Sequence, residues 1–210
     1  MFSEPMFNAV IEGNKTMTRR ILNPQPYGFE NGYPFYKYSR ITDERVRCKL
    51  IRPRYKVGET VYLKEPYYKH PCFETEYKYG FKGCGAFNIE KWSNKLFMPE
   101  EYARYFIEIT GSLCEQLQDI SDEDCLKEGV VREYMGDLFT NKLTAKTRKE
   151  HWEEHFGKMI KLDNNNSRNY LGYKTPQKAF AALIDKINGK GTWDSNPYVF
   201  AYDFKLLNNK

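Results

Sequence analysis

Near the start of the chain, basic and hydroxyl side chains follow one another with the spacing of a binding or catalytic site. Lys15 is followed within five positions by Thr16, Thr18, Arg19 and Arg20. The segment is rich in β-branched residues and should form a strand, so alternation would place Thr16, Thr18 and Arg20 on one face. An arginine beside hydroxyl groups can hold a phosphate or the edge of a base. The sequence therefore predicts a nucleotide- or RNA-related ligand here.

A second set of cations lies further along the chain. Arg45, Arg47 and Lys49 occupy every second position, with apolar residues between them. This alternation predicts a half-buried strand with a basic exposed face, which suits a phosphate backbone, although a solvated strand face would have the same pattern. We take the candidate substrate- or nucleic-acid-binding residues to be Thr16, Arg19, Arg20, Arg45, Arg47, Lys49 and Lys64.

Aromatic residues could add base stacking to these cations. The tyrosine-rich stretch 33–38 is one candidate, and Trp92 and Trp193 are two more. Bases of single-stranded nucleic acids stack on such rings. Core packing is the commoner use of aromatic residues, and it remains the alternative.

The segment from His151 to His155 matches the H-x-x-E-H pattern of one class of zinc peptidases. Histidines four positions apart lie on one face of a helix and can share a metal ion. A five-residue pattern is frequent by chance, however, and the one other histidine, His70, gives no clear third ligand. We therefore predict no metal site and no cofactor, and a charged helix over residues 145–160 in which Trp152 and Phe156 pack.

Local sequence signals predict the elements that position Lys15 and its neighbours. Ser3 can cap a short helix, Pro5 suits its first turn and Gly13 its end. Lys15 then lies at the exit of the helix, and residues 16–22 form the strand described above. Residues 23–44, with three prolines, are expected to form an irregular loop. A turn at Gly58 and a strand through residues 61–63 follow.

The second half of the chain alternates strands and helices. A strand is expected over residues 104–113, and a helix capped by Ser121 should end at Gly129. Thr175 and Pro176 predict the start of another helix. Residues 74–83 could form a hairpin, and residues 164–169 a loop. In the last strand, residues 198, 200, 202 and 204 are aromatic and alternate with smaller or polar residues.

The amino-acid composition limits the fold classes that the chain can adopt. The chain of 210 residues is 40% hydrophobic and 16% aromatic, which predicts one folded domain. Many strands with helices between some of them favour an α+β barrel over a doubly wound sheet. No apolar run reaches the roughly 18 residues of a membrane helix, and no signal peptide is recognisable, so we expect a cytoplasmic protein without a membrane partner. Five cysteines without a CxxC pair suit reduced thiols.

Charge is distributed unevenly along the chain. The net charge is +5; residues 1–60 hold 11 Lys or Arg and 6 Asp or Glu, whereas the remainder holds 22 of each. The surplus of positive charge is therefore N-terminal. This asymmetry permits an anionic partner, with a solvated basic surface as the alternative.

The order of the motifs resembles that of the ASCH domain, a relative of the PUA RNA-binding fold. The resemblance covers residues 3–65, 100–130 and 176–205, which leaves 66–99 and 131–175 as insertions in a single domain spanning 1–210. The longer arrangement is similar to ASCH proteins common in prophages. The motifs that carry it are G-x-K-T-x-T-x-R at Gly13–Arg20, a G-[DE]-x-[LV] turn and strand at Gly58–Val61, a helix ending in Glu128–Gly129, and N-G-K-G-x-W at Asn188–Trp193.

The resemblance implies a PUA-like β-barrel and a set of catalytic residues. Small ASCH enzymes that remove the acetyl group of acetylcytidine have a Lys, a Thr and a Glu at the positions of Lys15, Thr18 and Glu128. Amide hydrolysis needs a nucleophile, a base and an acid for the leaving amine. Thr18 would be the nucleophile, Lys15 the base, if burial and neighbouring arginines lower its pKa, and Glu128 the acid.

Two other functions remain open. The same cleft could belong to a non-catalytic RNA- or DNA-binding module of phage origin, or to a metal-dependent ribonuclease such as a related ASCH branch contains. Protein partners are not predicted. Lys15 and Arg20 could also be solvated charges, and Thr18 a structural strand residue. A negative charge on Glu128 would oppose the helix dipole, which suggests a use other than helix stability.

Overall fold

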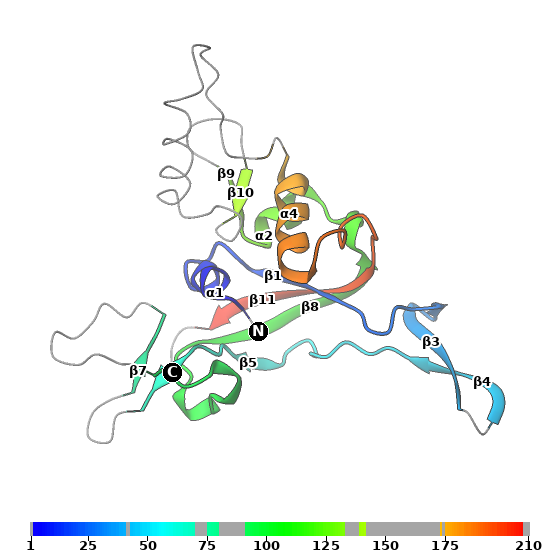
Figure 1. Ribbon diagram of the computed structural model, residues 1–210, viewed down its shortest axis with the longest axis horizontal. Helices are drawn as coiled ribbons and strands as arrows, with labels where there is room; N and C mark the ends of the chain where they lie inside the picture. Colours follow the sequence, from blue (N-terminus) through cyan, green and yellow to red (C-terminus); the bar gives the residue numbers. More distant parts are fainter. Residues whose placement is uncertain are drawn as a thin grey trace, which may run out of the picture.

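Four strands form the central antiparallel sheet of the computed structural model (Figure 1), which describes residues 2–40, 43–69, 75–79, 91–132, 139–141, 173 and 175–207. Their order is β1 (Met17–Ile21), β11 (Tyr198–Leu207), β8 (Phe106–Gln116) and β5 (Thr60–Tyr62). The sheet curls into part of a barrel. The expected α+β class is thus confirmed, as are the strands predicted in these four places.

Three helices pack against this sheet (Figure 1): α1 (Glu4–Ile11), α2 (Asp122–Lys127) and α4 (Pro176–Asn188). Ser121 Oγ accepts a hydrogen bond from the Asp124 N–H at 3.1 Å, and Thr175 Oγ1 accepts one from the Lys178 N–H at 3.3 Å. These are the predicted helix caps. Ser3 precedes α1, but its side chain makes no capping hydrogen bond, so that part of the prediction is wrong.

A second sheet projects from one end of the molecule, and we call it the arm (Figure 1). It consists of β2 (Gly28–Glu30), β3 (Tyr33–Arg40) and β4 (Asp43–Leu50), all antiparallel. The prediction of an irregular loop over residues 23–44 is therefore wrong. Asn31 and Gly32 both have positive φ, 50° and 80°, which is the two-residue turn that joins hairpin strands with the correct twist.

The predicted half-buried alternation in β4 is also wrong over the residues whose exposure is known. Cys48, Lys49 and Leu50 are all exposed. Among the described strands, β4 pairs with β3 alone. The arm has no second layer over these positions, so apolar and basic residues alternate there without a buried face.

Smaller elements complete the chain. β6 (Tyr67–Tyr68) pairs with β7 (Glu76–Tyr77), and β9 (Val130–Arg132) pairs with β10 (Phe139–Asn141). Short 3₁₀ helices are η1 (Lys95–Phe97), η2 (Glu100–Tyr102) and η3 (Leu117–Asp119). β7 pairs with the earlier β6, and the second half of the hairpin expected at 74–83 is not described. Residues 80–83, the predicted helix 145–160 with its HWEEH segment, and the loop 164–169 lie outside the described residues.

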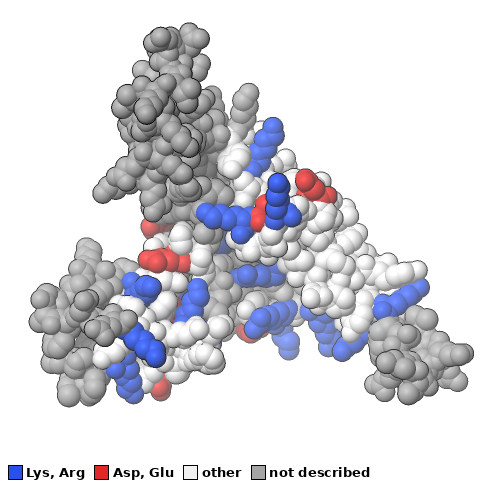
Figure 2. All heavy atoms as spheres, in the orientation of Figure 1, with Lys and Arg blue, Asp and Glu red and all other residues white. Residues whose placement is uncertain are grey.

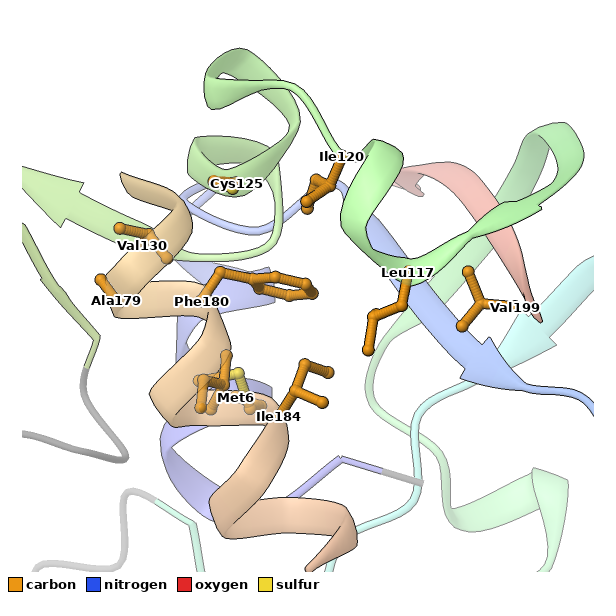
Figure 3. Close-up of a cluster of buried hydrophobic side chains, with 10 residues drawn as sticks. Met6, Leu117, Ile120, Cys125, Val130, Ala179, Phe180, Ile184 and Val199 are labelled. Atoms are coloured by element: carbon orange, nitrogen blue, oxygen red, sulfur yellow. The ribbon is translucent and has the colours of Figure 1, made fainter. Parts of the chain in front are cut away.

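Two hydrophobic clusters lie on the two faces of β11. Val199 packs with α2 and α4 in the cluster that Figure 3 shows, where the Phe180 ring of α4 lies among the other side chains. Phe200, Tyr202 and Phe204 belong to the other cluster, with Phe7 of α1. Val199 and Ala201 are as buried as the aromatic residues with which they alternate. β11 is a central strand covered on both faces.

No helix in the described part of the chain is both long enough and apolar enough to cross a membrane.

Candidate functional site

The end of α1 forms the corner that carries Lys15. Gly13, with φ of 75°, turns the chain out of the helix, a conformation that glycine adopts without strain. The Lys15 N–H donates to the Ala9 carbonyl at 3.0 Å, and the Thr16 N–H donates to the Lys127 carbonyl at 2.8 Å. The second bond joins the start of β1 to the last turn of α2. The two places are therefore held side by side.

Gly129 turns the chain out of the end of α2 beside this corner. Its φ is 93°, and a Cβ at this position would lie 3.5 Å from the Lys15 Cβ and 3.8 Å from the Ala9 Cβ. α2 begins with three acidic residues, where the helix dipole favours them, but it also ends with one, Glu128. A carboxylate at a helix C-terminus is unfavourable unless cations surround it.

Lys15 and Glu128 form a buried ion pair. Lys15 Nζ lies 2.5 Å from Glu128 Oε2 and also donates to the Glu128 carbonyl at 2.9 Å, and the two side chains are 3% and 4% exposed. Burial lowers the pKa of Lys15 below its ordinary 10.5; Glu128 opposes this shift, and the positive charges of Arg20 and Arg19 add to it. A lowered pKa is what a lysine needs in order to act as a general base.

Arg19 connects three carboxylates beneath this pair. Its guanidinium, 1% exposed, lies 2.8 Å from Glu115, 3.2 Å from Asp124 and 3.4 Å from Glu128 Oε1. Glu128 therefore has one oxygen toward Arg19 and the other toward Lys15. Arg19 was a predicted binding residue, but its donors already face these carboxylates, so it holds Glu128 in place.

A hollow of about 280 Å³ opens beside the ion pair. Lys15, Thr18 and Glu128 all line it, so the structure brings the three predicted catalytic residues to one cavity. Its volume lies near the lower end of the usual range for small-ligand pockets. Side chains from the N-terminal segment, β1, η1 and α4 form the rest of its wall: Phe2, Ser3, Met6, Arg19, Arg20, Ile21, Lys95, Phe180, Leu183, Ile184, Ile187 and Asn188.

The other predicted residues have different places. Arg20 is exposed, lines the hollow and lies 5.7 Å from the centroid of the Phe2 ring. Thr16 is half-buried and does not line the hollow. Lys64 Nζ donates to the Leu96 carbonyl at 3.1 Å, away from the ion pair. Lys49 is exposed in the arm, and the side chains of Arg45 and Arg47 lie outside the described part.

Two residues of the hollow were not singled out as site residues from the sequence. Lys95 Nζ donates to the Phe2 carbonyl at 2.9 Å and so fixes the N-terminal segment as one wall. Ser3 Oγ is buried without a hydrogen-bond partner among the described residues. Neither has a sequence signal of its own: Lys95 comes from a distant segment, and Ser3 has the pattern of a helix cap.

Lys and Arg side chains predominate on the molecular face shown in Figure 2, with fewer acidic residues between them. The cations at the base of the hollow differ from these, because each has carboxylate neighbours. The hollow thus combines a neutralised polar floor with apolar walls, which suits a small, largely uncharged ligand that presents a few polar groups. No protein-family model, no curated protein and no solved structure matches this chain.

Proposed function

We propose that the chain is an ASCH-type, PUA-like protein that hydrolyses the amide of an acylated, cytidine-type nucleoside in this hollow. The observation that carries the proposal is the buried contact between Lys15 and Glu128, 2.5 Å, at a cavity that Thr18 also lines. The motif resemblance of the sequence assigns the same three residues to base, acid and nucleophile. The geometry of the hollow and the motif resemblance support the proposal independently.

Burial of an ion pair needs a reason other than stability. Removing two charges from water costs several kcal/mol per ion, and hydrophobic residues of similar volume are often at least as stabilising. Here the pair lies at a helix C-terminus, where the carboxylate also opposes the helix dipole. Groups with perturbed titration are concentrated at functional sites, and burial lowers the pKa of Lys15.

The ion pair can supply both a base and an acid. Transfer of one proton from Lys15 Nζ to Glu128 Oε2 gives a neutral amine and a carboxylic acid. The amine accepts the Thr18 hydroxyl proton as Thr18 Oγ attacks the acyl carbon. Glu128 then protonates the nitrogen of the leaving base as the C–N bond breaks, which leaves an acyl ester on Thr18 and the charged ion pair.

Water completes the cycle. The proton passes again from Lys15 to Glu128, and Lys15 accepts a proton from a water molecule that attacks the ester carbon. The bond to Thr18 Oγ breaks, and Glu128 returns a proton to that oxygen. The products are the deacylated nucleoside and the carboxylic acid, and the ion pair ends with the protons with which it began.

A non-catalytic RNA- or DNA-binding module is the second candidate. The observations that favour it are the exposed Arg20 at the hollow and the many cations on the face in Figure 2. The neutralised charges of Lys15 and Arg19 favour hydrolysis instead, because a phosphate site would present free cations.

The test measures release of the deacylated nucleoside from acetylcytidine and a panel of acylated nucleosides by chromatography. Wild type should turn over at least one of them, and Thr18→Ala and Glu128→Gln should each lower kcat by about 100-fold or more. Thr110→Ala removes an exposed threonine of β8 outside the hollow and should retain wild-type turnover. No turnover by wild type would remove the hydrolase proposal and leave the binding module.

A further inference from the structure

The positive charge of the chain is concentrated in the arm and in the residues that directly follow it. Residues 27–56 contain 8 Lys or Arg and 3 Asp or Glu, and the rest of the chain contains 25 of each. The whole net charge of +5 is therefore the charge of this segment. The arm itself, residues 28–50, contains 5 Lys or Arg and 3 Asp or Glu and projects from one end of the molecule (Figure 1).

Contacts with the body distinguish the two faces of the arm. The Phe29 ring lies 5.2 Å from the Tyr198 ring of β11, and Pro34, which pairs with Phe29, is buried. Tyr33 and Phe35 flank Pro34 in β3, so their side chains lie on the opposite face. We call that face, with Tyr27, Tyr33, Phe35 and Lys37, the outer face.

The outer face combines exposed rings with a cation. Tyr27 and Tyr33 are 68% and 55% exposed. Lys37 Nζ lies 3.7 Å from the centroid of the Tyr27 ring, and the Tyr27 and Phe35 rings are 6.3 Å apart. Exposed aromatic residues usually mark a binding surface, since burying them on a partner removes them from water.

We infer that the outer face of the arm binds a single-stranded nucleic acid. Bases of any sequence stack on exposed aromatic rings, and cations beside the rings neutralise the phosphates. In a duplex the faces of the bases are covered by their neighbours, so the rings favour a single strand. No residue that lines the hollow belongs to the arm, so this inference adds a second site to the proposed function.

Fluorescence anisotropy with labelled 20-nucleotide oligo-dT and oligo-U, at several salt concentrations, tests the inference on the full chain. Tyr27→Ala and Tyr33→Ala should each raise Kd by about 10-fold, through loss of one stacked base. Lys37→Gln should lower the slope of log K against log salt by about 0.7, since one phosphate contact is lost. Comparison of the two oligomers shows whether the sugar matters.

Matched controls remove similar groups elsewhere. Phe97→Ala deletes an exposed ring of η1, and Lys190→Gln an exposed cation after α4; both should bind as wild type does. The inference is overturned if wild type binds neither oligomer, if the tyrosine variants bind as tightly as wild type, or if an equal-length duplex binds more tightly. Circular dichroism establishes that the variants are folded. The assay involves no hydrolysis, so failure of the hydrolase proposal leaves it unaffected.

Discussion

The hydroxyl of Ser3 is buried beside the hollow and has no hydrogen-bond partner among the described residues. An unsatisfied buried hydroxyl costs about 1–3 kcal/mol, unless a ligand supplies the missing partner. Ser3 has the sequence position of a helix cap, yet it does not cap α1. Its hydroxyl is therefore free to bond a molecule in the hollow.

Replacement of Ser3 distinguishes a helix-capping role from a role in binding a molecule in the hollow. Ser3→Ala should not lower the free energy of unfolding, because no capping bond is lost and an unsatisfied buried hydroxyl is removed, whereas Ser121→Ala, which loses a real cap, should cost about 1 kcal/mol. Urea denaturation followed by circular dichroism measures both. An equal loss in the two variants would mean that Ser3 does cap α1 in solution.

At the scale of single elements, the sequence predicted those features that depend only on neighbouring residues. The caps at Ser121 and Thr175 and the turn glycines Gly13 and Gly58 were predicted from neighbouring residues alone. The arm was missed because its prolines and aromatic residues outweighed the Asn31–Gly32 turn signal. Pro34 is compatible with β3 because it lies near the start of the strand.

The end of α2 is the element on which the site geometry depends most. Gly129→Ala should cost about 1–2 kcal/mol of stability, because an alanine at φ 93° is strained. Gly58→Ala, at φ 85° with nothing within 4 Å of its Cβ, should cost a similar amount. Only the first should lower turnover, because it displaces Glu128 from Lys15. Equal turnover in both variants, by the chromatographic assay, would contradict this role for the glycine.

At the scale of the whole molecule, the sequence predicted the class of the fold and the N-terminal location of the charge. Contacts between segments that are distant in the sequence could not be predicted. The strand β11 was predicted, but its burial on both faces depends on such contacts, because α2 and α4 cover one face and α1 with the curl of the sheet covers the other. Glu115 and Asp124 around Arg19 come from β8 and α2, and no local pattern unites them. The resemblance supplied what spacing could not, the pairing of residues 15 and 128.

Global stability should depend on pH through a buried thiol. Burial raises the pKa of Cys125 from 9.0 to about 12. Above pH 9 the unfolded chain loses a proton that the native chain retains, so stability falls as pH rises toward the native value, by about 2 kcal/mol at about pH 10.5. Urea titrations at several pH values should give a shallower decline for Cys125→Ala than for wild type. Cys48→Ala, at an exposed position, should follow wild type.

The position of β11 between β1 and β8 constrains how the protein can be made. β11 pairs with β1 across roughly 180 residues of chain, and every strand that it joins precedes it. During synthesis the partners on both sides emerge from the ribosome long before the strand that unites them, and until then their edges have no hydrogen-bond partners. The complete sheet can therefore assemble only after β11 has been translated.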